Sequence, residues 1–142
     1  MSWVLVIVGL VPFVFGGILN WAVMEFPHSA PPFLGAGIVF LLLWGIVAYF
    51  MKRYIKSTGK LVALLNLAAF LDLVLVGIQI FVFQSFWFNP AGTWTQLFYL
   101  PLISMGSVLT RWSRSMFPAY CAAFILMLAA SFVGGKLKQE KA

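Results

Sequence analysis

Residues 64–80 read LLNLAAFLDLVLVGIQI, an apolar run with a single carboxylate, Asp72, near its middle. A run of about 20 such residues crosses the hydrocarbon core of a bilayer as a helix. A charged side chain at the centre of a span costs about 2.5–3.5 kcal/mol on insertion scales, so it usually faces a bundle interior or a water-filled cavity. The stretch therefore predicts a helix buried in a membrane bundle, with Asp72 turned away from lipid.

The composition of the whole chain supports a membrane location. Of its 142 residues, 63% are hydrophobic and 8% are charged, whereas a soluble domain has about 45–50% apolar and about 25% charged residues. We therefore predict an all-α, polytopic transmembrane helical bundle. Residues 1–142 form one integral membrane domain, with the lipid bilayer as its main contact. The expected location is the cell membrane, and specifically a bacterial cytoplasmic membrane.

Hydropathy and length predict about five spans, near residues 2–24, 33–51, 61–86, 94–110 and 116–134. The first of them has no positively charged start, which favours a retained span over a cleaved signal peptide. Tryptophan favours the membrane–water interface. All but one of the tryptophans lie near the predicted span ends, namely Trp3, Trp21, Trp87, Trp94 and Trp112; Trp44 lies inside a span.

Residues 94–110 are the weakest of these predicted spans, because they contain Pro101, Ser104, Gly106 and Ser107. The alternative is four spans, with 94–110 as a re-entrant or interfacial segment. Lys and Arg concentrate in cytoplasmic loops, but their distribution does not decide between the two arrangements. With the N-terminus inside, both arrangements put the basic residues of 52–60 inside. Five spans put 111–114 inside and the basic tail 136–141 outside, and four spans reverse these two. Length favours five.

Asp72 and Gln79 are seven residues apart and therefore share a helix face, which also carries Ala68, Ala69 and Val76. Asn66 lies on another face of the same predicted helix. Asp72, Gln79 and Asn66 are candidates for helix contacts or for lining a polar path. Asp72 either holds the bundle or a partner helix together, as a neutral or hydrogen-bonded acid, or binds a proton or cation. No basic residue lies deep in any predicted span, so an ion pair within the chain is not expected.

Small residues recur on one face of the first and the last predicted spans. Gly9, Gly16 and Asn20 follow each other at spacings of seven and four, and the last span repeats the pattern with Ala119, Ala123, Ala130 and Gly134. Small residues at such intervals allow helices to approach closely in lipid. We expect these faces to pack against another helix, either within this chain or in another subunit. Asn20 is a candidate residue for such a helix contact.

Glu25 and His28 flank Pro27 in the first predicted turn and are candidates for binding a polar group. One histidine and one carboxylate do not make a metal site, which needs three or four ligands. No metal and no cofactor are therefore expected. The positive net charge of +6 does not indicate nucleic acid, because the basic clusters end apolar runs, as they do where membrane topology is fixed.

The sequence contains no recognisable catalytic motif, and three acidic residues in the whole chain leave little for paired acid–base chemistry. We therefore predict no enzymatic activity and no catalytic residues. The leading hypothesis is a non-catalytic membrane protein that acts through helix contacts, as an accessory or structural subunit with a protein partner or as a homo-oligomer. The alternative is a small proton- or cation-linked transporter or channel-like protein with Asp72 in a polar path.

Overall fold

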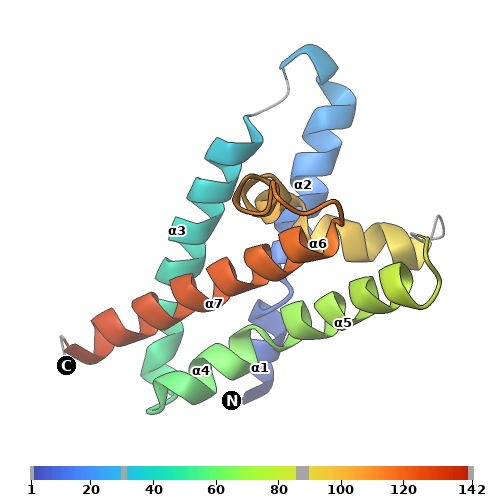
Figure 1. Cartoon of the computed structure of the whole chain (residues 1–142). Helices are drawn as coiled ribbons and strands as arrows, with labels where there is room; N and C mark the ends of the chain where they lie inside the picture. The colour runs from blue at the N-terminus through green and yellow to red at the C-terminus, as the bar shows by residue number, and fades with distance from the viewer. Residues whose placement is uncertain (1, 30–31, 86–89, 141–142) are drawn as a thin grey trace.

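The computed structural model describes residues 2–29, 32–85 and 90–140, and the regular elements of these residues are all helical. Figure 1 shows their arrangement. In chain order they are α1 (Ser2–Val8), α2 (Val11–Glu25), η1 (Pro27–Ser29), α3 (Phe33–Met51), η2 (Lys52–Tyr54), α4 (Thr58–Leu65), α5 (Leu67–Phe81), α6 (Pro90–Leu109) and α7 (Phe117–Glu140).

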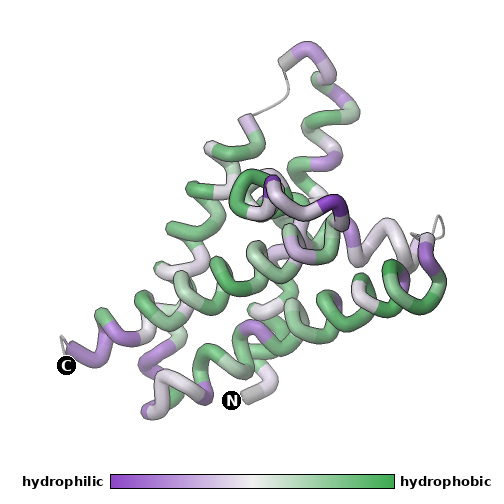
Figure 2. The backbone as a smooth tube through the Cα atoms, in the orientation of Figure 1, coloured by the Kyte–Doolittle hydropathy of each residue, from purple (hydrophilic) through white to green (hydrophobic). Residues whose placement is uncertain are grey.

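Three segments of the described chain are long and apolar enough to cross a membrane: Trp3–Glu25, which combines α1 and α2, Phe33–Tyr54, and Phe117–Glu140. The pair α4 and α5 qualifies only as one bent segment, so the chain has three candidate spans, or four with this pair. Apolar residues run along these helices, and hydrophilic residues gather at their ends (Figure 2). Large apolar side chains such as Ile7, Leu42 and Ile125 are exposed, as expected for a surface in contact with lipid rather than water.

The predicted span 61–86 is corrected in two ways. It is broken at Asn66, where α4 and α5 meet at an angle of 47°, and the helix ends at Phe81. The side-chain nitrogen of Asn66 donates a hydrogen bond to the carbonyl oxygen of Val62, 2.9 Å away. Asparagine side chains compete for backbone groups in this way and interrupt helices. Residue 86 lies outside the described residues, as does Trp87.

The five-span prediction is not confirmed. Helix α6 covers the doubtful segment 94–110 but is not among the helices that are apolar enough to cross. Helices α3 and α7 cross, and from their contact at Gly45 and Gly134 both continue toward the same end of the molecule (Figure 1), so that one turn further along both helices Tyr49 meets Lys138. Successive spans alternate in direction, so the second and the fifth span of a five-span protein would run in opposite directions.

Glycines set the closest approaches between these helices. A Cβ atom at Gly134 would lie 2.0 Å from the carbonyl oxygen of Gly45, and one at Gly16 would lie 1.8 Å from that of Leu97. These contacts join α7 to α3 and α2 to α6. The prediction that small residues of the first and last spans allow close packing is therefore confirmed for Gly16 and Gly134, and the contacts are made within the chain.

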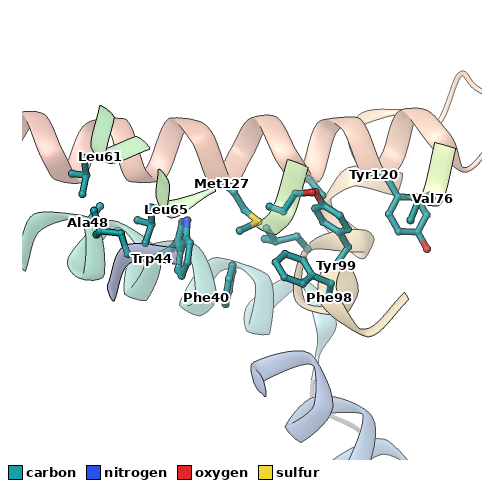
Figure 3. Close-up of a cluster of buried hydrophobic side chains, with 14 residues drawn as sticks. Phe40, Trp44, Ala48, Leu61, Leu65, Val76, Phe98, Tyr99, Tyr120 and Met127 are labelled. Atoms are coloured by element: carbon teal, nitrogen blue, oxygen red, sulfur yellow. The ribbon is translucent and has the colours of Figure 1, made fainter. Parts of the chain in front are cut away.

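A buried cluster lies where α3, α4, α6 and α7 meet (Figure 3). Phe40 stacks on Trp44 at a centroid distance of 5.8 Å, and Tyr99 of α6 packs edge-on against Tyr120 of α7 at 5.6 Å. Trp44 is 1% exposed, whereas Trp3, Trp21, Trp94 and Trp112 are exposed. Ala69 and Val76 of α5 also belong to this cluster, on the same buried face of α5 as Asp72.

Candidate functional site

The buried face of α5 carries Ala69, Asp72, Val76 and Gln79. This is the face that the spacing of seven residues between Asp72 and Gln79 predicts, and it turns toward the chain's own helices α6 and α7. Asp72 is 9% exposed and Gln79 is fully buried. The structure therefore encloses both polar groups within one chain rather than presenting them on its surface.

Oxygen Oδ2 of Asp72 is buried and has no hydrogen-bond partner among the described residues. Two phenol groups, those of Tyr99 on α6 and Tyr120 on α7, lie within electrostatic range of the carboxylate. The hydroxyl of Tyr99 donates to the carbonyl oxygen of Ala69 at 2.6 Å, one turn before Asp72 on α5. Its proton is thus used by the backbone, and the Tyr99 oxygen retains capacity to accept a hydrogen bond.

Among the residues that the structure describes, no lysine, arginine or histidine forms an ion pair with Asp72. The phenol oxygens of Tyr99 and Tyr120, which feel the charge of Asp72, are of the kind that can accept a hydrogen bond from a protonated acid or serve as ligands to a cation. The arrangement can therefore hold a proton, and its oxygens are of the kind that hard cations use.

Gln79 is the second polar residue on the buried face of α5, two turns after Asp72. Its Nε2 donates to Oγ1 of Thr95 on α6 at 3.0 Å, and Thr95 donates in turn to the carbonyl oxygen of Gly92 at 2.7 Å. Asp72 and Gln79 therefore share a face of α5 but have different environments: Gln79 is held in a hydrogen-bonded chain, whereas one oxygen of Asp72 is not.

Asn66 belongs to a polar cluster that does not include Asp72. Its Oδ1 accepts from the indole nitrogen of Trp44 at 3.2 Å, and its Nδ2 donates to the hydroxyl of Ser131 at 2.9 Å. These bonds link the α4–α5 junction to α3 and α7. Asn66 is therefore satisfied as a structural link, and the structure does not place it beside Asp72.

The remaining candidates lie on the outside of the described chain. Asn20 is exposed on α2, Glu25 is exposed at the end of that helix, and His28 is exposed in η1. No group of three or more His, Cys, Asp or Glu residues is close enough to hold a metal ion in the described ranges 2–29, 32–85 and 90–140. Glu25 and His28 remain predicted binding residues with no further support.

Sequence reasoning missed the partners of these polar residues. Tyr99 and Thr95 are four residues apart and share a face of α6, a signal that was available in the sequence. Ser131 and Trp44 are single polar groups in apolar runs, and only the tertiary structure brings them to Asn66. Comparison of the chain with protein-family models, with curated proteins and with solved structures gives no match.

Proposed function

We propose that the protein is a small proton- or cation-linked membrane transporter or channel-like protein in which Asp72 binds the transported or coupling ion. The observation that carries the proposal is the buried Oδ2 of Asp72 without a hydrogen-bond partner. A carboxyl group that serves only to hold helices together gains from having its oxygens bonded, because an unsatisfied buried polar atom costs about 1–3 kcal/mol. An ion site, by contrast, needs an oxygen that the protein itself does not occupy.

The orientation of Asp72 favours this reading over a subunit contact made by the same residue. Asp72 faces α6 and α7 of its own chain and is 9% exposed, so a helix of another protein does not reach it without opening the bundle. Ionisable residues that are enclosed in this way mark ion pathways and proton relays in many membrane proteins. The leading hypothesis from the sequence, an accessory subunit, was based partly on Asp72 as a contact with a partner. The burial of Asp72 within its own chain removes that argument.

A four-span arrangement fits the directions of the helices. In it α1–α2, α3, the bent pair α4–α5 and α7 cross, while α6 remains on the side where α5 ends. The hydroxyl of Thr58 donates to Oε1 of Gln139 at 3.1 Å, so the loop before α4 and the end of α7 lie on one side. That side then carries Lys52, Arg53, Lys56, Lys60, Lys136, Lys138 and, by its position in sequence, Lys141. We propose that this side is cytoplasmic, because such basic residues accumulate there.

The first test is proton flux into vesicles that contain the purified protein and an internal pH-sensitive dye. Under an imposed membrane potential, we expect flux above that of protein-free vesicles, and Asp72→Asn should reduce it to the protein-free rate. Asn has nearly the same shape as Asp but cannot exchange a proton. If protons are not the ion, the same comparison with Na⁺ and K⁺ gradients should reveal the flux. Equal flux in the wild type and in Asp72→Asn for all three ions would contradict the proposal.

The small number of acids permits a direct spectroscopic control. The chain has three acidic side chains, and Glu25 and Glu140 are exposed. The Glu25→Gln/Glu140→Gln variant therefore keeps Asp72 as its only acidic side chain. Its flux should match that of the wild type. Infrared difference spectra during titration should contain a carboxyl band that disappears when Asp72→Asn is added, while the signal of the C-terminal carboxylate stays the same in both variants.

A helix contact with a partner is a second candidate, supported by one observation. Asn20 is exposed on α2 within the first candidate span, and an amide that faces lipid is stabilised when another helix supplies a hydrogen-bond partner. In a Cys121→Ser background, Asn20→Cys should give a crosslinked dimer or a crosslink to a partner protein in native membranes. Ile18→Cys, exposed on another face of the same helix, serves as the positional control. Equal or absent crosslinking at both positions would argue against a contact centred on Asn20.

A further inference from the structure

A groove runs along the outside of the bundle between α3 and α7. It has a volume of about 590 Å³, and its lining includes Leu41, Gly45 and Tyr49 from α3 and Ala130, Gly134 and Leu137 from α7. The side chains that line it are apolar apart from the hydroxyl of Tyr49. Its floor has little side-chain bulk, because Gly45 and Gly134 approach each other closely there and Ala130 adds only a methyl group. Its volume lies in the range of about 300–1,000 Å³ that is typical of ligand pockets.

One end of this groove is basic. The ammonium group of Lys138 lies 5.0 Å from the ring centre of Tyr49, which lines the groove. Lys136 is exposed on the last turns of the same helix, where its ammonium group lies 5.8 Å from the ring centre of Phe132, outside the groove lining. Helix α7 also contacts η2, which contains the exposed Arg53. In the described part of the chain, Glu140 is the acid at this end, and it forms no ion pair with these residues. Hydrophilic residues mark this end of α7 and the α3–α4 connection in Figure 2.

We propose that this groove binds an anionic phospholipid from the leaflet on the basic side. One acyl chain lies along the apolar groove, and the phosphate group lies at its end beside Lys138, with Lys136 and Arg53 adding positive charge on the same side of the membrane. Basic residues close to a membrane surface attract anionic lipid headgroups. Long Lys and Arg side chains can lie along apolar surface while their charges reach the headgroup level. The Tyr49 ring fits the same boundary, since one end of its side chain is apolar and the other is polar.

Charge also argues for a lipid rather than a second copy of the chain. Two copies inserted in the same orientation and packed groove to groove would bring the same basic ends together, and this repulsion opposes the contact. A lipid phosphate has the opposite charge. The groove glycines, moreover, already contact each other across α3 and α7, so they do not present a free small-residue face for an additional helix.

The test compares lipids that differ only in headgroup. Native mass spectrometry of the purified full chain should detect a bound phosphatidylglycerol that survives activation better than phosphatidylcholine with the same acyl chains. Lys136→Gln/Lys138→Gln should weaken retention of phosphatidylglycerol about tenfold and remove the preference. Arg111→Gln/Arg114→Gln makes the same change in charge away from the groove, and retention should stay at the wild-type level.

A second variant tests the groove independently of charge. Ala129 lines the groove and is exposed, so Ala129→Phe should fill it without disturbing the core, and should abolish retention of phosphatidylglycerol although all basic residues remain. The proposal is overturned by equal retention of both lipids, by undiminished binding in Ala129→Phe, or by a protein partner or second copy that occupies the groove. Asp72→Asn should bind lipid as the wild type does, so the ion site and the lipid site are tested separately.

Discussion

Gly16→Ala should destabilise the protein by about 1–3 kcal/mol, the usual cost of overpacking a tight core, whereas Gly17→Ala should be neutral or slightly stabilising. The two glycines are adjacent on α2 but differ in what their missing side chains would meet. A Cβ at Gly16 would lie 1.8 Å from the carbonyl oxygen of Leu97, while one at Gly17 would have nothing within 4 Å. A carbonyl oxygen moves only with its helix, so the substitution must separate α2 from α6.

The measurement is the unfolding transition in mixed detergent micelles, with SDS as the denaturant and circular dichroism or tryptophan fluorescence as the signal. Alanine has the higher helix propensity, by about 0.5–1 kcal/mol in a helix interior, so propensity alone predicts that both variants gain stability. Equal midpoints for Gly16→Ala and Gly17→Ala would therefore show that α2 does not pack on α6 through Gly16.

Asn66→Leu should also destabilise the bundle strongly, by about 2 kcal/mol, if each hydrogen bond between membrane helices is worth about 0.6 kcal/mol and an orphaned donor costs more. The substitution removes the bonds from Asn66 to Trp44, Val62 and Ser131. It leaves the indole N–H of Trp44 without an acceptor in an apolar site. Ser131 keeps its bonds to Met127 and Leu128, so the loss is concentrated on Trp44.

The same denaturation assay provides the matched control. Asn20→Leu makes an identical chemical change at an exposed position of α2 and should leave the stability of the isolated protein within about 0.5 kcal/mol of the wild type. Trp44→Phe keeps an aromatic ring against Phe40 but leaves a cavity at a buried site and removes the donor to Oδ1 of Asn66, so it should also destabilise the bundle. An Asn66→Leu variant as stable as Asn20→Leu would exclude a stabilising role for this cluster.

Part of the candidate site follows directly from the sequence. A helix that carries Asp72 and Gln79 seven residues apart must put both on one face, and an acid in lipid is too costly to face outward. The structure places both on the buried face of α5, as predicted. The neighbours of Asp72 could not be predicted from the sequence. Tyr99 and Tyr120 come from helices that are distant from α5 in sequence, and hydropathy does not indicate which helices are adjacent.

Hydropathy predicted a lipid environment, the helical class and most span positions. The reason is that the free energy of transferring a segment into lipid is a sum over the residues of that segment. The break at Asn66 and the common direction of α3 and α7 came with the tertiary structure. They depend on contacts such as Gly45 with Gly134 and Asn66 with Ser131. In lipid, apolar side chains gain little by leaving one apolar neighbour for another. Close backbone approach and hydrogen bonds between distant residues therefore decide how the helices pair.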